Sequence, residues 1–201
     1  MQSEYLKTFL LESPDVEERY KTKLGLINNV DPFTLNIRDL DNSIHGVPPV
    51  TNMDIVSYLV LTSYYTKEQM KCYKSLQWYK YLESGLIVDV GTKEVNGFFV
   101  LLGKVKHSLR PKAKPLEVWC IITKDEAIST AHCTCMAGSA EVCSHVGALL
   151  FAAEYANRRR EEASCTDVLN AWMMPSGSSN IRFTEMLLDI RNASTIKSKP
   201  V

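Results

Sequence analysis

Three cysteines and one histidine lie within thirteen consecutive positions of this sequence. Cys133, Cys135, Cys143 and His145 follow a C-x-C-x7-C-x-H pattern. Three thiolates and one imidazole are a usual ligand set for structural Zn²⁺, at about 2.3 Å for sulfur and about 2.0–2.1 Å for nitrogen. All four tetrahedral positions would be filled by protein atoms, which leaves none for a reacting water. The pattern therefore predicts one structural Zn²⁺ ion and no metal-centred catalysis.

The residues around the pattern indicate which elements carry these ligands. Side chains two positions apart leave the same face of an extended segment, so Cys133 and Cys135 should clasp the ion from the end of a strand. The apolar periodicity of residues 142–159 predicts a helix that starts at the second ligand pair. Strand alternation turns His132 away from the two cysteines. We therefore interpret His132 as a group behind the ligands or on the surface. His132 and His107 are the two potential extra ligands.

Any single cysteine has a simpler interpretation, as a small buried apolar residue. We adopt it for the three cysteines outside the pattern, Cys72, Cys120 and Cys165. For four potential ligands set between a predicted strand and a predicted helix, coincidence is a poor explanation.

No targeting or membrane segment is predicted. The chain has no run of about 18 apolar residues, as a membrane-spanning helix requires. Residues 1–12 lack the basic and apolar regions of a secretory signal. An intracellular location is therefore expected, where cysteines at this spacing serve as metal ligands rather than disulfides.

The first part of the chain is predicted to be helical. Helical patterns cover residues 2–12, 13–29 and 66–84, and another helix opens at Thr51. Residues 30–50 show no period and contain turn-forming residues, so we expect a long connector, partly disordered in isolation.

Four strands are predicted next, at residues 86–90, 98–106, 116–123 and 127–133. The second strand is apolar on both faces, so it should be central in a sheet or covered by helices. The connections are too short for parallel crossovers, which favours an antiparallel meander. The fold class is therefore α+β, with N-terminal helices, an antiparallel β-meander and a zinc-bridged strand and helix.

We predict three segments along the chain. Residues 1–50 form an N-terminal helical region and connector. Residues 51–175 form an α+β domain that contains the zinc finger at about residues 116–160. Residues 176–201 form a flexible C-terminal segment.

Charge is balanced overall but unevenly distributed. The chain has 23 Lys and Arg against 23 Asp and Glu, whereas residues 66–114 carry ten against four. No acid lies between positions 104 and 114, and Pro111 and the following Pro115 disfavour a strand in the second half of this segment. The candidate phosphate contacts of this predicted exposed loop are Lys104, Lys106, Arg110, Lys112 and Lys114. The alternative is a solvated hairpin that keeps strand edges from pairing.

A second candidate surface is the helix predicted at residues 66–84. Lys71 and Lys74 alternate there with aromatic residues such as Tyr73 and Trp78. Interleaved rings and cations can stack on bases and contact phosphates. The alternative, which is the commoner arrangement, is that the rings pack in the core and the lysines are solvated.

Several short motifs carry a resemblance to a known family. They are Tyr73-Lys-Ser-Leu76, Ser84-Gly85, Lys104-Val-Lys-His-Ser108, His132-Cys-Thr-Cys-Met-Ala-Gly138, Cys143-Ser-His145, and Cys165-Thr166 followed by Trp172. The segment Ala131–Ala153 resembles the SWIM zinc finger, in which the ligand pattern follows a β-hairpin and leads into a helix. Residues 54–175 resemble the animal SWIM-type proteins in which this module often precedes a YqaJ-like viral recombinase nuclease domain.

The resemblance implies a DNA-binding or protein-interaction module. SWIM fingers occur in transposases, chromatin-associated ATPases and ubiquitin-ligase receptors. A YqaJ-like nuclease would need a sizeable further domain with acidic metal ligands and a catalytic lysine. Residues 176–201 contain no such cluster, so the nuclease part is expected to be absent from this chain.

We therefore expect a non-enzymatic zinc-finger module, nuclear in location, that contacts DNA or another nucleic acid and has no membrane or small-molecule partner. The alternative is a protein-interaction adaptor without nucleic-acid affinity, using apolar surface near Trp78 or Trp172, and the zero net charge favours it. A third possibility is a folded module that acts only when joined to a nuclease.

Overall fold

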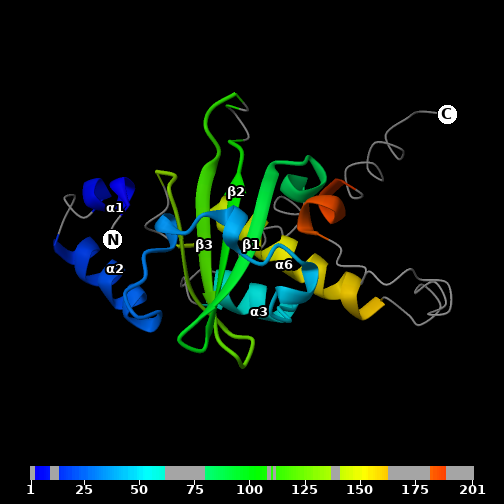
Figure 1. Cartoon of the computed structure of the whole chain (residues 1–201), viewed down its shortest axis with the longest axis horizontal. Helices are drawn as coiled ribbons and strands as arrows, with labels where there is room; N and C mark the ends of the chain where they lie inside the picture. The colour runs from blue at the N-terminus through cyan, green and yellow to red at the C-terminus, as the bar shows by residue number, and fades with distance from the viewer. Residues whose placement is uncertain are drawn as a thin grey trace.

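The computed structural model describes seven parts of the chain: residues 3–9, 14–61, 80–107, 110, 112–136, 141–162 and 182–188. A four-stranded antiparallel sheet lies at its centre (Figure 1). The strands pair in chain order: β1 (Ile87–Val95), β2 (Phe98–Val105), β3 (Leu116–Ile122) and β4 (Ile128–Cys133). The predicted α+β class and antiparallel meander are confirmed.

The first strand is longer than predicted. It was expected to end at Val90, but β1 stays paired with β2 as far as Val95, opposite Phe98. Asn96 and Gly97 between them both have positive φ, at 54° and 77°. A two-residue turn of this kind matches the twist of the two strands, so pairing continues up to the turn.

One face of the sheet is covered by the long helix α6 (Ser144–Glu162), predicted at residues 142–159. Beside it lie α3 (Asn52–Val56) and the single π-helical turn η4 (Ser57–Leu61). The helix α3 begins at Thr51, as predicted, with a capping box between Thr51 and Asp54. Residues 182–188 add the buried side chains of Phe183 and Met186 to this core.

The other face is covered by an N-terminal layer, visible beside the sheet in Figure 1. We define this layer as residues 3–9 and 14–40. It contains α1 (Glu4–Phe9), α2 (Pro14–Leu26) and the 3₁₀ turns η1 (Pro32–Thr34) and η2 (Ile37–Asp39). Its buried side chains meet Val100, Leu102 and Trp119 of the sheet.

The connector over residues 30–50 is ordered in the folded chain. Asp31, Asn36 and Ser43 each precede a 3₁₀ turn, and each side chain accepts a hydrogen bond from the backbone two residues on. Asp41 then exchanges two backbone hydrogen bonds with Thr92 of β1, at 3.0 and 2.8 Å. The last turn, η3 (Ile44–Gly46), lies on the α6 side, where Ile44 is buried. The connector thus passes around the β1 edge from one face of the sheet to the other.

The prediction that β2 is covered on both faces is confirmed. Val100 and Leu102 belong to the core under the N-terminal layer, whereas Leu101 and Val105 belong to the core under α6. The helix predicted at residues 66–84 lies mostly outside the described residues. Its predicted stop is confirmed, because Gly85 has a φ of 65° and donates its N–H to the Leu82 carbonyl.

No helix in the described ranges is long and apolar enough to cross a bilayer. The region around Cys165 and Trp172 lies outside those ranges, as does most of the segment predicted to be flexible at residues 176–201.

Two glycine-to-alanine substitutions should have opposite effects on stability. A Cβ at Gly103 of β2 would lie 2.5 Å from Cδ1 of Leu149 in α6, whereas a Cβ at Gly25 of α2 meets nothing within 4 Å. Gly103→Ala should lower the free energy of unfolding by about 1–3 kcal/mol through overpacking. Gly25→Ala should raise it by about 0.5–1 kcal/mol, because alanine favours the helix. Urea unfolding of both variants measures these free energies. A Gly103→Ala variant whose free energy of unfolding changes in the same direction as that of Gly25→Ala would contradict the close packing of β2 against α6.

Candidate metal centre

The four predicted ligands meet at one end of the sheet. Cys133 is the last residue of β4, Cys135 lies two residues further, Cys143 precedes α6, and His145 is in the first turn of α6. Their donor atoms all lie within 4.8 Å of one another, and Cys143 Sγ is 3.8 Å from His145 Nδ1. Tetrahedral Zn²⁺ at its usual bond lengths separates such donors by about 3.5–3.8 Å. The cluster is therefore compatible with one metal ion if the donor atoms move slightly closer to one another.

Thr134 connects the first ligand pair to the sheet beyond the end of β4. Its N–H donates to the Glu117 carbonyl at 3.0 Å, and its Oγ1 accepts from the Glu117 N–H at 3.1 Å. Cys133 and Cys135 on either side of Thr134 consequently turn toward α6. At the other pair, the Gly147 N–H donates to the Cys143 carbonyl at 3.0 Å, which places Cys143 at the start of the helical hydrogen bonding.

The electrostatics of the cluster favour a bound cation. Hydrogen bonding to Cys135 and Cys143, together with burial, raises the pKa of the Cys133 thiol. Burial lowers the pKa of His145, but its interactions with the sulfur atoms of Cys135 and Cys143 outweigh that effect and raise the pKa to about 9. Both shifts favour the protonated forms of Cys133 and His145. A divalent cation bound by the four side chains would displace these protons, because metal ligands must be deprotonated.

Two aromatic rings flank the histidine ligand. The rings of Tyr81 and His107 meet His145 edge-on, with centroids at 6.0 and 5.8 Å. Of the two potential extra ligands, His107 therefore neighbours His145 but is not a member of the four-donor cluster.

His132 lies on the opposite face of the sheet, as strand alternation predicts. It stacks on Trp119, with centroids 5.9 Å apart, and its Nε2 is 3.0 Å from the hydroxyl of Tyr5 in α1. Burial and the nearby charge of Lys23 lower its pKa to about 3, so the ring is neutral. The alternative that His132 is a surface group was wrong, because the N-terminal layer covers it.

Cys120 is a buried core residue, as predicted, and burial raises the pKa of its thiol. Cys72 and Cys165 lie outside the described residues, so their interpretation stays a prediction.

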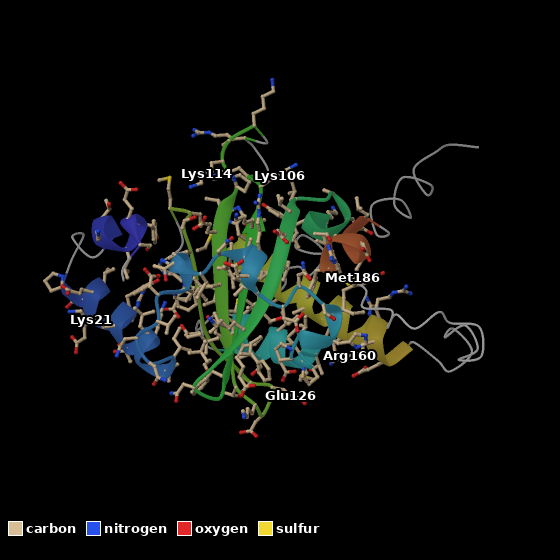
Figure 2. The ribbon with its side chains drawn as sticks, viewed as in Figure 1. Lys21, Lys106, Lys114, Glu126, Arg160 and Met186 are labelled. Atoms are coloured by element: carbon tan, nitrogen blue, oxygen red, sulfur yellow. The ribbon has the colours of Figure 1, made fainter. Side chains whose placement is uncertain are left out.

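The candidate phosphate contacts lie at the same end of the sheet as the ligands. We call residues 104–114 the basic hairpin, which joins β2 to β3. Arg110, Lys112 and Lys114 are exposed, and Lys106 is half-buried. Figure 2 shows Lys106 and Lys114 at this end and Glu126 at the other. Lys71 and Lys74 lie outside the described residues.

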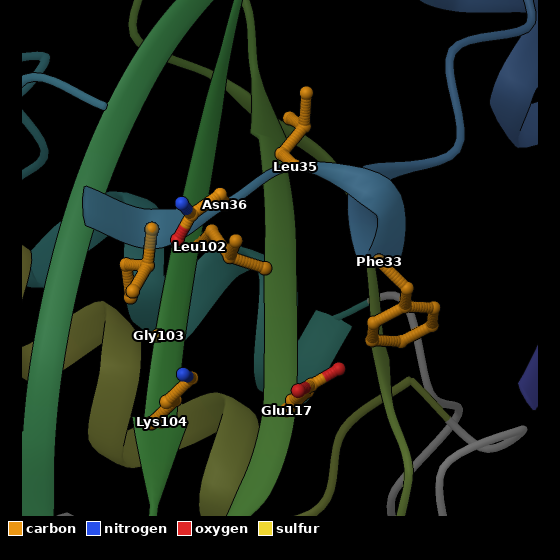
Figure 3. Close-up of a pocket in the computed structure, with 8 residues that line it drawn as sticks. Phe33, Leu35, Asn36, Leu102, Gly103, Lys104 and Glu117 are labelled. Atoms are coloured by element: carbon orange, nitrogen blue, oxygen red, sulfur yellow. The ribbon is translucent and has the colours of Figure 1, made fainter. Parts of the chain in front are cut away.

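Lys104 differs from the other cations of the basic hairpin. It was predicted to belong to an exposed loop, but it lies within β2 opposite Glu117 and is half-buried. Its side chain lines a small pocket between the 3₁₀ turns and the sheet, together with Phe33 and Asn36 (Figure 3). The strand predicted at residues 98–106 is confirmed at this position, and the loop prediction was wrong there, because the strand continues to Val105.

We call residues 134–143, between β4 and α6, the metal loop. Sequence reasoning did not single out the residues that hold this loop on the side away from the ligands. Glu141, two residues before Cys143, forms ion pairs with Lys23 at 2.7 Å and Arg19 at 3.5 Å. Lys23 and Arg19 lie more than a hundred positions before Glu141 in the chain, so no local motif reveals these ion pairs. The positive φ of Glu141, 65°, is likewise visible only in the structure.

Comparison with known proteins gives this chain no relative. No family model, no curated protein and no solved structure matches it. The case for a metal centre therefore depends on the donor set and its geometry.

Proposed function

We propose that this chain is a non-enzymatic zinc module of the SWIM type that binds nucleic acid through its basic hairpin and works in the nucleus. The observation that supports this proposal best is the closed set of three sulfur donors and one nitrogen donor beside that hairpin, where the rings of His107 and His145 meet. Four protein donors complete a tetrahedral Zn²⁺ shell, which suits a structural ion rather than a catalytic one. The order β3, β4, ligands and α6 matches the ββα arrangement of a SWIM finger.

The charge of the basic hairpin supports a polyanionic partner. Among the described residues, none of its five cations forms an ion pair. Cations on a projecting hairpin can follow a phosphate backbone and release its counterions on binding. The metal ligands begin at the end of β4, the strand that pairs with β3, so the ion would stiffen the base of this surface.

Charge reversal tests the nucleic-acid proposal. The triple variant Lys106→Glu, Lys112→Glu and Lys114→Glu should bind short single- or double-stranded DNA or RNA more weakly at low salt. The slope of log affinity against log salt should also become shallower, by about 0.9 for each phosphate of duplex DNA that the protein no longer neutralises. Fluorescence anisotropy with end-labelled oligonucleotides measures both quantities.

The matched control is Lys93→Glu, an exposed lysine of β1 near the opposite end of the sheet. It makes the same type of charge change away from the hairpin and should leave the slope unchanged. The proposal is refuted if no oligonucleotide binds at low salt, or if the triple variant and the control behave alike.

Exposed apolar side chains support the alternative, a protein-interaction adaptor. Met136 in the metal loop is fully exposed, and Met53 on α3 is 75% exposed with Val56 beside it at 43%. Exposed apolar residues indicate a protein contact where they form a contiguous patch. A pull-down from cell extract with and without nuclease separates the two functions: a protein that stays captured after nuclease treatment supports the adaptor.

A further inference from the structure

A buried lysine of the N-terminal layer reaches the metal loop. Lys23 of α2 is only 7% exposed. Its Nζ lies 2.7 Å from Glu141 Oε1, donates to the Ala131 carbonyl at 3.1 Å, and is 6.0 Å from the centre of the Trp119 ring. Removing an ammonium from water is costly unless it is paired. Here the ammonium of Lys23 is paired with the carboxylate of Glu141, and this ion pair joins α2 to the loop.

Glu141 is held from four directions. Its Oε1 contacts Lys23, its Oε2 accepts from Thr130 Oγ1 of β4 at 3.0 Å, and its carbonyl accepts from the Tyr58 hydroxyl of η4 at 3.4 Å. Arg19 lies 3.5 Å from Oε1. A glutamate with φ of 65° occupies a region that non-glycine residues rarely adopt, and surrounding contacts must maintain it.

We infer that Glu141 is a positioning residue of the metal centre, and that Lys23 couples retention of the metal ion to docking of α2. This inference depends on the metal-binding part of the proposed function. Cys143 and His145 follow Glu141 by two and four positions, whereas Cys133 and Cys135 are placed by β4. Glu141 therefore sets how the second ligand pair faces the first. Residues behind the ligands commonly change metal affinity by about 10–100-fold when removed.

The test uses the full chain loaded with Zn²⁺ and measures the rate of zinc transfer to a coloured chelator. Glu141→Gln keeps the shape of the side chain and removes its charge, and Lys23→Met removes the ammonium. Each should release zinc about 10–100-fold faster than the unsubstituted chain. The double variant should be no faster than the faster single variant, because both changes remove the same interaction.

Two matched controls separate this role from general effects of charge. Lys21→Met changes an exposed lysine of the same helix, which pairs within α2 with Glu17. Glu126→Gln changes another glutamate of positive φ, 68°, at the far end of the sheet. Both should release zinc at the unsubstituted rate. If Lys23→Met does not fold, Glu141→Gln and Lys23→Arg still test the inference, because Lys23→Arg keeps the positive charge. Lys23→Arg should then release zinc more slowly than Glu141→Gln.

The coupling must also act in reverse, since linkage between two equilibria is reciprocal. Removing zinc should speed hydrogen exchange at the amides of residues 20–24 in α2, and this acceleration should shrink in Glu141→Gln. If one zinc binds but Glu141→Gln releases it at the unsubstituted rate, the inference is overturned while the metal site stands. If the unsubstituted chain binds no zinc, the proposed function fails as well.

Discussion

Cys143→Ser is expected to remove the metal ion and unfold the part of the chain built around α6. Binding of structural Zn²⁺ contributes on the order of 10 kcal/mol to folding. Whole domains are stable by only about 5–15 kcal/mol. Loss of one of four ligands should therefore abolish the cooperative unfolding transition of this region. The measurements are metal content, with about one equivalent expected for the unsubstituted chain, and thermal unfolding followed by circular dichroism.

The matched control for this loss is Cys120→Ala. Cys120 is fully buried in β3 and is not part of the four-donor cluster. Its removal should cost about 1 kcal/mol, typical of a single core substitution, and leave the zinc content unchanged. An unsubstituted chain whose melting temperature is the same with and without chelator would contradict a folding role for the metal.

The expected size of the effect follows from what the cluster connects. Cys133 ends β4, and His145 lies in the first turn of α6. Helix α6 supplies much of the core on its side of the sheet, including Leu149, Leu150 and Ala153. An ion bound by both elements fixes the start of the helix against the sheet. Without it, nothing would join the two ligand pairs at the point where the helix has to dock.

Local patterns in the sequence were sufficient to predict the sheet and the cluster of four potential ligands. The two apolar faces of β2 predicted its central position, because alternating side chains must be covered on both sides. The C-x-C spacing predicted that Cys133 and Cys135 act together, since side chains two positions apart in an extended segment share a face. Cys143 and His145 lie at the start of α6, and there the choice of residue types near the first pair indicated the cluster.

Long-range and backbone features could not be predicted in this way. The connector over residues 30–50 has no hydrophobic period, because its turns are held by Asp31, Asn36 and Ser43 and its buried apolar residues are divided between the two cores. The pairing of Lys23 with Glu141 depends on which surface α2 covers, which is a property of the tertiary fold. The loop prediction failed at Lys104 because charge suggested exposure there, whereas strand pairing decided its place.

Trp119→Ala should lower the free energy of unfolding by about 3–5 kcal/mol, the range observed for large aromatic residues removed from cores. Trp119 is fully buried where the N-terminal layer meets the sheet. Tyr20 and Phe33 meet it edge-on at 5.9 and 6.4 Å, and His132 stacks on it at 5.9 Å. The substitution therefore removes the centre of an aromatic cluster that three parts of the chain share.

The loss of stability should be largest in the N-terminal layer, because Cys133 and the other ligands lie on the opposite face of the sheet. Zinc content should stay near one equivalent, while hydrogen exchange in α1 and α2 accelerates. Zinc should nevertheless leave faster, because weaker docking of α2 loosens the contact between Lys23 and Glu141. Trp119→Phe, which retains an aromatic ring, should be destabilised less than Trp119→Ala. If Trp119→Ala instead releases its zinc as the N-terminal layer unfolds, the two faces unfold as one unit. The contact between Lys23 and Glu141 would then be strong enough to join the faces, since it connects α2 directly to the metal loop.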